Sequence, residues 1–412
     1  MYGQQFQCKN CVGDPYYQNR GPQQQGCGPC GQQQIAGPCQ KSCKKECDCK
    51  KCVNVPKSYY DPRLANGCNG PPLLRQGMPQ RSVTCWKLNY LTANRQNLAA
   101  HLDPLLINPW GIVVFHNQLW VVNNTSDVIT NYDLFGNRIL GPISLRDAYQ
   151  NATHPTGIAI NCGGGFSVTN GAATRSAQFL IASEHGVVEA YNPMVDPTQA
   201  FITLNMQITG RISVFKGLAV ANNILYLANF FQRVIDVFDS SYNRLLGFNF
   251  VDGDTSDPIP MDYSPHNIVH IGCYLYVLWA RKDPNITLAP LFGPGHGYVS
   301  VFNYDGSFVR RFTSRGVLDT PWAMVPAPCN CGFPPGSFLI GNNGNGRINV
   351  FDCNGAFIGP MLGQSGLPIV IEGLRGLAPH YAEFNEIFYT ASPENLVDGY
   401  IGSIVADQVI TF

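Results

Sequence analysis

Short apolar runs separated by turn residues recur through most of the chain. The clearest case is 338–351, where Phe338–Ile340 and Ile348–Phe351 are mainly apolar and the residues between them are mainly asparagine and glycine. Asparagine and glycine tolerate the backbone of a tight turn, so this stretch predicts a β-hairpin. The same strand, turn and strand pattern occurs five more times, at 119–133, 179–192, 225–239, 275–303 and 387–402.

A second short apolar phrase precedes each hairpin, and a small residue stands near its centre in every copy. These central residues are 46 to 60 positions apart along the chain, and they are Gly111, Gly157, Gly217, Asn267, Ala323 and Gly376. A lone hairpin is marginally stable in water, so repeated units of this kind must stack on one another. The spacing is that of a four-stranded propeller blade. The pattern therefore predicts an all-β fold, a six-bladed β-propeller over about 84–412.

The last repeat is too short to form a blade by itself. Only 36 residues follow Gly376. An open ring would leave two unpaired sheet edges, which soluble proteins avoid. We therefore expect a strand near 86–93, upstream of the first repeat, to complete the last blade and close the ring.

Charge and hydropathy exclude some partners. The chain has 27 basic and 27 acidic residues, and only 13% of its residues are charged. Nucleic-acid binding and attraction to anionic membranes both need a basic excess, so neither is expected. We find no apolar run of about 20 residues that predicts a transmembrane segment. The first residues lack the apolar stretch of an ordinary secretory signal.

The first 68 residues have a different composition from the rest. They are rich in glutamine, glycine, proline and cysteine and poor in aliphatic residues, so they cannot bury enough apolar surface to fold alone. A proline- and glycine-rich linker is expected at 69–83. Eleven of the 16 cysteines lie before residue 86, at Cys8, Cys11, Cys27, Cys30, Cys39, Cys43, Cys47, Cys49, Cys52, Cys68 and Cys85.

Three chemical states are open for this cysteine-rich segment. Dense cysteines at mixed spacing favour disulfides or intermolecular cross-links. The two pairs Cys8/Cys11 and Cys27/Cys30 also have the spacing of a four-thiolate zinc site. The third alternative is a reduced tail without a fixed structure. The sequence does not decide among them, because cysteine pairing cannot be read from spacing.

Polar residues near the strand ends are candidates for a site in the propeller channel. Carboxylate, amide and imidazole groups from several blades could hold a divalent ion there and support hydrolysis or elimination. The ordinary explanation is structural, because asparagine after a strand favours turns and histidine beside proline is commonly a hydrogen-bonded donor. The candidates are Asn124, His154, Glu184, Asn229, His266, Arg281, Asn343, Arg375 and Glu394.

Other features are less specific. No Gly-x-Ser-x-Gly, His-Glu-x-x-His or phosphate-loop lysine motif occurs. Three long connections are expected at 196–211, 252–264 and 283–297, where binding loops could gather. Aromatic residues in register with the repeat are expected in the core between blades, namely Trp110, Trp120, Tyr132, Phe238 and Phe351.

Several phrases carry a resemblance to a known family. Asn108–Gly111, Phe215–Ala219, Gly293–Phe302 and Gly399–Ile404 resemble, in order, the phrases of an uncharacterised NHL-like six-bladed propeller family. The resemblance runs from about 91 to 404. It implies the NHL-repeat propeller fold, and it implies no particular activity. Many members carry a PEP-CTERM sorting tail, which this sequence lacks.

The cysteine-rich segment is similar in composition and layout to those of fibril-layer proteins on giant DNA viruses of amoebae. This resemblance implies a structural protein at the virion surface, anchored or cross-linked to other layer proteins by its cysteines. An extracellular or host-cytoplasmic location is the alternative. Two other functions stay open, a lactonase-like metal-dependent hydrolase or lyase and a zinc-dependent interaction adaptor.

Overall fold

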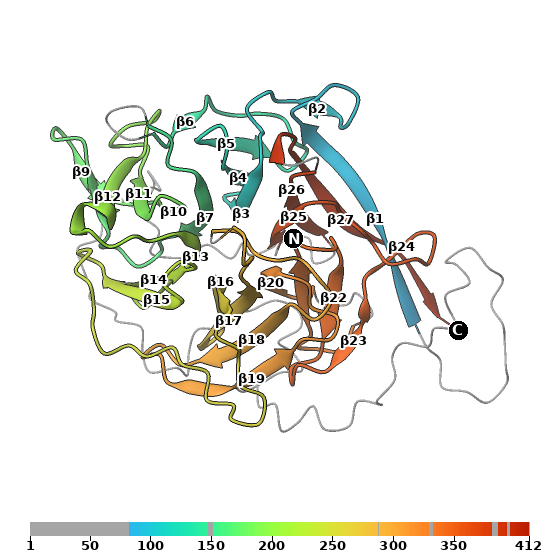
Figure 1. Ribbon diagram of the computed structural model, residues 1–412. Helices are drawn as coiled ribbons and strands as arrows, with labels where there is room; N and C mark the ends of the chain where they lie inside the picture. Colours follow the sequence, from blue (N-terminus) through green and yellow to red (C-terminus); the bar gives the residue numbers. More distant parts are fainter. Residues whose placement is uncertain are drawn as a thin grey trace, which may run out of the picture.

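The computed structural model describes residues 82–146, 151–286, 288–328, 333–380, 386–393 and 396–411, with side chains described between 85 and 407. These residues form six main sheets arranged as blades around a central axis (Figure 1). The predicted six-bladed β-propeller is thus confirmed. The predictions for 1–68, for nearly all of the linker and for Glu394 lie outside the described residues. No helix in the described ranges has the length and apolar character needed to cross a membrane.

The first three blades follow one another along the chain. Each begins with its innermost strand and proceeds outward by antiparallel pairing. The first contains β3 (Pro109–Phe115), β4 (Gln118–Asn123), β5 (Val128–Asp133) and β6 (Ile143–Ser144). The second contains β7 (Pro155–Ile160), β10 (Phe179–Ser183), β11 (Val187–Tyr191) and β12 (Phe201–Asn205), and it carries the small hairpin β8 (Ser167–Thr169) and β9 (Thr174–Ser176). The third contains β13 (Phe215–Ala221), β14 (Ile224–Asn229) and β15 (Val234–Asp239).

The remaining blades continue in the same sense around the axis. The fourth contains β16 (Tyr263–Ile271), β17 (Tyr274–Arg281), β18 (Gly297–Phe302) and β19 (Phe308–Ser314). The fifth contains β20 (Pro321–Pro326), β21 (Phe338–Asn342), β22 (Ile348–Phe351) and β23 (Phe357–Pro360). The sixth contains β25 (Leu374–Pro379), β26 (Glu386–Ala391), β27 (Tyr400–Thr411), β1 (Ser82–Ala93) and β2 (His101–Leu102), with β24 (Leu362–Gly363) beside β1.

One expected loop is partly a strand. The connection predicted at 196–211 contains β12 and a short 3-10 helix, η4 (Gln207–Thr209). Its sequence, Phe-Ile-Thr-Leu-Asn, has the β-branched residues of a strand, but the flanking polar residues hid this signal. Pairing with β11 completes the second blade, so tertiary context decided the assignment.

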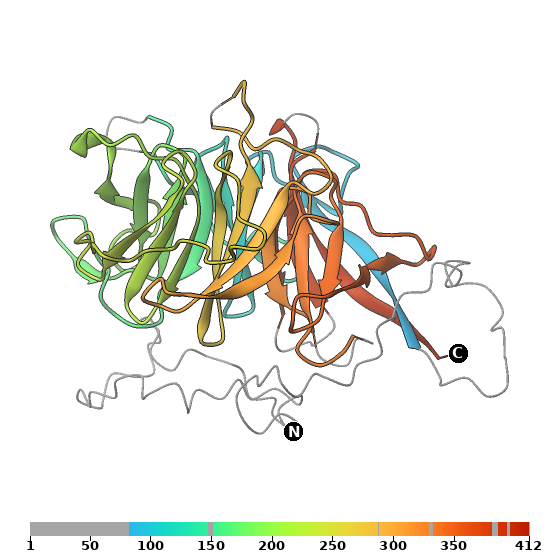
Figure 2. The same ribbon diagram turned by 60° about the horizontal axis from the view of Figure 1, so that its bottom comes forward.

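The ring closes through the two ends of the propeller chain. β1 runs antiparallel to β27 over nearly its whole length, with Leu88 opposite Ile404 and Ala93 opposite Tyr400. Figures 1 and 2 show this pair as the long blue and red strands that extend together from the ring. The closing strand predicted from the sequence near 86–93 lies within β1. The pairing covers an edge that would otherwise be open to other strands.

Middle strands are buried on both faces because each blade lies between two others. All five residues of β10 and all five of β11 are buried. Rings from neighbouring blades meet in the space between, as where Trp120 lies 4.8 Å from Phe179 and 6.2 Å from Tyr191. Burial of such rings removes roughly 150–250 Å² of surface each, so contacts between blades dominate the core.

Candidate functional site at the propeller axis

Each innermost strand has an irregularity near its start that turns one side chain toward the axis. The pairing register shifts between Phe215 and Gly217 in the third blade and between Pro321 and Ala323 in the fifth. A bulge of this kind redirects the side chain of the skipped residue. We call the six residues at this position the axial residues, and they are Trp110, Thr156, Lys216, His266, Trp322 and Arg375. All six are at most 5% exposed.

Small residues follow the axial residues because neighbouring inner strands approach closely there. A Cβ added to Gly217 would lie 1.9 Å from Asn267 Oδ1, and one added to Gly376 would lie 2.7 Å from the Trp110 carbonyl oxygen. The repeated small position of the sequence is therefore a packing requirement. A cavity of about 110 Å³ lies beside these residues, and Trp322 is part of its lining.

The axial residues fill the centre of the ring with one another. The Trp110 and Trp322 rings meet edge to face, with centroids 5.9 Å apart. Trp322 Nε1 donates a hydrogen bond to the carbonyl oxygen of Lys216 at 2.8 Å, across two blades. The Lys216 ammonium lies 5.3 Å and the Arg375 guanidinium 4.3 Å from the centre of the Trp110 ring. At the level of the axial residues, the axis is therefore packed with aromatic and cationic groups.

At one end of the axis, each blade contributes one polar side chain to what we call the mouth ring. In blade order its members are Asn124, Glu184, Lys216, His266, Asn343 and Arg375. Asn124 and Glu184 follow the second strands of their blades, as Asn343 does in the fifth. The other three are axial residues. Glu184 is 26% exposed, so it marks the side of the ring that is open to solvent.

The first half of the mouth ring, from the first three blades, is hydrogen-bonded throughout. Lys216 Nζ forms an ion pair with Glu184 Oε1, and Asn124 Nδ2 donates to Glu184 Oε2 at 3.2 Å. Asn124 Oδ1 accepts from Asn108 Nδ2 at 3.0 Å. Burial alone would raise the pKa of the Glu184 carboxyl, but the charge and hydrogen bond of Lys216 outweigh it and lower that pKa overall. Glu184 is therefore ionised at neutral pH.

The second half, from the last three blades, has polar atoms without partners. His266 Nδ1 lies 3.1 Å from the Pro321 carbonyl oxygen, and burial lowers the pKa of this histidine to about 3. Asn343 Nδ2 donates to the Leu374 carbonyl oxygen at 3.1 Å. Among the described residues no hydrogen-bond partner exists for His266 Nε2, Asn343 Oδ1, Arg375 Nε or Arg375 Nη1. Burial lowers the pKa of Arg375 to about 10, so it keeps its charge at pH 7.

The charge at the axis does not suit a divalent cation. Lys216 and Arg375 supply two positive charges and Glu184 one negative charge, while His266 is neutral. In the described part of the chain, no three His, Cys, Asp or Glu side chains are grouped so as to hold a metal ion. Like charges close together repel strongly where water is excluded. The residues present here do not fit the divalent ion considered from the sequence.

The other sequence candidates lie around the ring or away from it. His154 is adjacent, with Nδ1 3.2 Å from the Asn124 carbonyl oxygen. Asn229 lies within the third blade, where its Nδ2 donates to Asp236 Oδ2 at 2.7 Å. Arg281 forms a largely exposed ion pair with Asp262 at 2.7 Å. Five of the nine candidates thus belong to the mouth ring, and the ring member absent from that list is Lys216.

An alignment of the six repeats identifies Lys216 as a member of this ring. Lys216 stands where other copies have Trp110, Thr156 or Arg375, directly before the small residue. A lone lysine in an apolar phrase marks a position that points away from the sheet core. Trp110, expected between blades, is buried as expected, but its ring faces the two axial cations.

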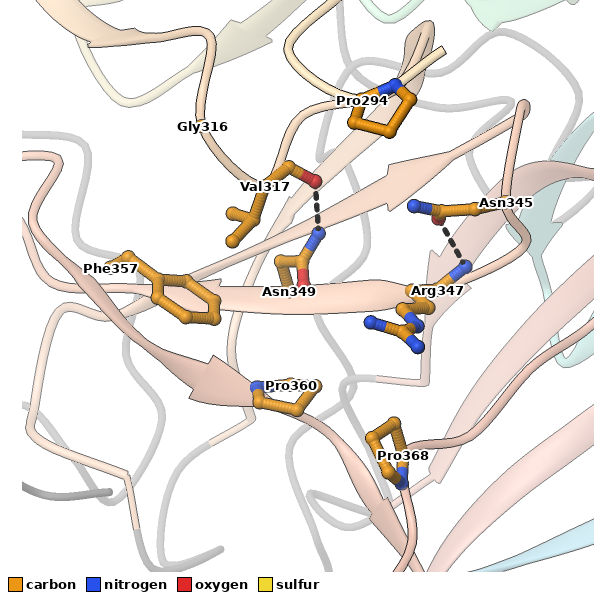
Figure 3. Close-up of a pocket in the computed structure, with 9 residues that line it drawn as sticks. All are labelled: Pro294, Gly316, Val317, Asn345, Arg347, Asn349, Phe357, Pro360 and Pro368. Carbon is orange, nitrogen blue, oxygen red and sulfur yellow. Dashed lines mark hydrogen bonds between the residues drawn. The ribbon is translucent and has the colours of Figure 1, made fainter. Parts of the chain in front are cut away.

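A second concave site lies at the rim, between the fourth and fifth blades. It is a pocket of about 390 Å³ (Figure 3). Asn349 Nδ2 donates to the Val317 carbonyl oxygen at 3.2 Å and holds the floor of the pocket together. Its lining is mainly apolar, with one exposed cation, and consists of Pro294, Gly316, Val317, Asn345, Arg347, Asn349, Phe357, Pro360 and Pro368. Of the three expected loops, only 283–297 reaches this pocket.

No family model matches the chain. Among curated proteins, it is 62% identical over 356 residues to "Uncharacterized protein L690" of Acanthamoeba polyphaga mimivirus, covering 86% of this chain and 95% of that protein. It is 61% identical over 370 residues to "Uncharacterized protein R648" of the same virus, covering 90% and 91%. The chain belongs to this family of mimivirus proteins. The family is therefore one of six-bladed propellers.

Solved structures with a related arrangement are distant in sequence. A Bacteroides thetaiotaomicron protein of unknown function has a TM-score of 0.48 at 10% identity, with 79% of this chain and 76% of that chain covered. The soluble aldose sugar dehydrogenase of Escherichia coli has a TM-score of 0.47 at 9% identity, covering 78% and 100%. A streptogramin B lyase has 0.46 at 10% identity, covering 78% and 98%. At these values the likenesses carry no argument about activity.

Proposed function

We propose that the chain is a non-enzymatic structural or binding protein of a virion surface layer. In this proposal the propeller, of NHL type, is a rigid scaffold, and the cysteine-rich segment at 1–68 anchors it or cross-links it to other layer proteins. The observation that supports a scaffold best is the packed axis. Trp110, Trp322, Lys216 and Arg375 pack against one another at the level of the axial residues, and the cavity beside them on the axis has a volume of only about 110 Å³.

The family supports a viral setting for this scaffold. Relatives at 62% and 61% identity that match along most of their length are encoded by a mimivirus. The enzymatic alternative needs ligands for a divalent ion, and the axis instead has two buried cations. The zinc adaptor depends on Cys8, Cys11, Cys27 and Cys30, which lie outside the described residues.

A scaffold of this kind would bind through its rim and loops. The pocket between the fourth and fifth blades has three prolines and Phe357, which is 42% exposed. Exposed apolar lining beside the exposed Arg347 suits contact with an apolar segment that carries an acidic group. This pocket is the rim site that we assign to partner binding within the layer.

Gel analysis of purified virus particles tests the proposal. Particles from infected host cells are separated on reducing and non-reducing gels, and the chain is detected with an antibody to the propeller. We expect the chain in washed particles, at high mass without reductant and at about 45 kDa with it. Absence from washed particles, or a free monomer in both lanes, would contradict the proposal.

A matched pair of variants locates the cross-link. Serine at the ten cysteines from Cys8 to Cys68 is expected to abolish the high-mass species. Serine at Cys273, an exposed cysteine of the propeller, is expected to leave it unchanged. If the Cys273→Ser protein loses the species and the ten-serine protein keeps it, the cysteine-rich segment is not the cross-linking element.

A further inference from the structure

The two halves of the mouth ring differ in a way that points to a missing ligand. Asn124 and Asn343 occupy equivalent positions in the first and fifth blades, and each donates its Nδ2 hydrogen to a carbonyl oxygen of the next blade. Asn124 Oδ1 then accepts a hydrogen bond from Asn108, whereas Asn343 Oδ1 has no partner in the described structure. The same arrangement of hydrogen bonds is thus complete at Asn124 on one side of the ring and incomplete at Asn343 on the other.

Among these groups, the buried positive charge of Arg375 most clearly requires a ligand. Its side chain is 5% exposed, and the Nε and Nη1 atoms have no hydrogen-bond acceptor in the parts of the chain described. Among the described residues no salt bridge joins Arg375 to a carboxylate; the charge of Glu184 acts on it, but Glu184 is paired with Lys216. A buried charge without a partner is costly, so buried guanidinium groups are normally matched by an anion. The Trp110 ring, 4.3 Å away, supports one face and leaves the in-plane N–H groups available.

The other two unpartnered atoms are acceptors. His266 Nδ1 lies beside a carbonyl oxygen, so Nδ1 holds the proton and Nε2 presents a lone pair. Asn343 Nδ2 is the donor to Leu374, which assigns Oδ1 as the free acceptor. These atoms come from adjacent blades, next to the blade that contributes Arg375. A ligand that matches these atoms combines an anionic group for Arg375 with a hydroxyl donor for His266 Nε2 or Asn343 Oδ1.

We infer that a small hydroxycarboxylate binds in the second half of the mouth ring. Its carboxylate accepts hydrogen bonds from Arg375, and its hydroxyl donates to His266 Nε2 or Asn343 Oδ1. The net positive charge of the axis favours this anion, and the Lys216 ammonium adds to the attraction. The assignment goes beyond the scaffold function and does not depend on it. Binding involves no chemical step.

Calorimetric titration of the full-length chain with three probes tests the assignment. The probes are glycolate, which has both groups, acetate, which lacks the hydroxyl, and ethylene glycol, which lacks the charge. We expect binding in the order glycolate, acetate, ethylene glycol, with glycolate at least about tenfold tighter than acetate, since one charge-assisted or neutral hydrogen bond is worth about that factor. Equal binding of glycolate and acetate, or of glycolate and ethylene glycol, would overturn the assignment. So would the absence of glycolate binding.

Two substitutions at the equivalent asparagines place the site. Asn343→Asp puts a carboxylate at the position that contacts Leu374, the residue before Arg375, so we expect glycolate to bind at least about tenfold more weakly. Asn124→Asp puts the same charge beside Glu184, on the satisfied side. Both variants lose the hydrogen bond from the amide to the next blade. A difference between their melting temperatures therefore reports how the new carboxylate interacts with the charges around it. We expect Asn343→Asp to have the higher melting temperature. Equal melting temperatures with unchanged glycolate affinity in Asn343→Asp would refute the site.

A pair of arginine variants provides a second, independent control. Arg375→Gln is expected to abolish glycolate binding, whereas Arg281→Gln, at a solvent-accessible ion pair with Asp262 at the end of β17, is expected to leave it unchanged. If Arg375→Gln does not fold, the Asn343→Asp comparison decides the question by itself. Glycolate affinity that falls in Arg281→Gln and persists in Arg375→Gln would place the anion at Arg281 and refute the axial site.

Discussion

A buried carboxyl between the first two blades should make the propeller less stable as pH rises. Glu189 in β11 is fully buried. Its Oε1 accepts a hydrogen bond from Thr153 Oγ1 at 3.2 Å, and its Oε2 has no hydrogen-bond partner among the described residues. Burial raises the pKa of Glu189 well above its usual value, and the nearby Asp127 carboxylate raises it further. Glu189 is therefore protonated in the folded protein at pH values where the unfolded chain has lost that proton.

The sign and slope follow from this difference in proton binding. Below the ordinary pKa of glutamate both states are protonated, and Glu189 has no effect on the pH dependence. As pH rises above about 4.5, the unfolded chain releases the proton and the folded chain keeps it. Each pH unit then lowers the free energy of unfolding by about 1.4 kcal/mol, until the pH reaches the folded pKa. Glu189→Gln keeps the shape of the protonated group and removes the titration.

Guanidinium unfolding followed by tryptophan fluorescence, from pH 4 to pH 8, measures this effect. We expect wild type and Glu189→Gln to be similar near pH 4, and the variant then to gain stability over wild type by up to about 1.4 kcal/mol for each pH unit, until the pH reaches the pKa of Glu189 in the folded protein. Glu372→Gln is the control, since it makes the same chemical change at an exposed position. A constant difference between wild type and Glu189→Gln at every pH would refute the reasoning, because it would mean that Glu189 does not titrate on unfolding.

Three further substitutions test the packing of the ring by the same denaturation assay. Asp236→Asn removes a buried carboxylate that pairs with two arginines at 2.5 and 2.9 Å, and should cost about 3–5 kcal/mol, whereas Asp254→Asn, at a partly exposed carboxylate that accepts hydrogen bonds from Ser256, should cost far less. Trp86→Ala empties a fully buried position in the closing strand and should cost about 3–5 kcal/mol, against under about 0.5 for Phe135→Ala, which is 75% exposed. Trp322→Phe deletes the hydrogen bond to the third blade's inner strand and should cost about 1–3 kcal/mol. Equal costs within either pair, or an unchanged Trp322→Phe protein, would contradict the packing described.

The repeat was readable from the sequence because it depends on local pattern. Apolar runs of strand length, asparagine and glycine at the turns, and a small residue at each inner strand all reflect constraints within one blade. The hairpin expected at 338–351 is formed by β21 and β22, with a positive φ of 67° at Gly346. The short last repeat indicated closure by an upstream strand, since an unpaired edge is unfavourable in any ring.

The composition of the axis was only partly readable. The sequence identified five of the six mouth-ring residues as polar groups near strand ends. Lys216 was missed because its role depends on a bulge that turns its side chain inward, and only a comparison of all six repeats indicates that position. The contacts that close the axis join residues far apart in the chain, such as the bond from Trp322 to the Lys216 carbonyl, 106 positions away.

By itself, the sequence determined that this protein is a ring of repeated sheets joined at its own ends, because strand pattern and turn chemistry act over a few residues. Only the tertiary structure decided which polar groups have partners. Hydrogen-bond satisfaction depends on atoms from different blades meeting within about 3 Å, and no local pattern encodes that meeting. This is why Asn124 and Asn343, alike in sequence context, differ so sharply in what they offer to a ligand.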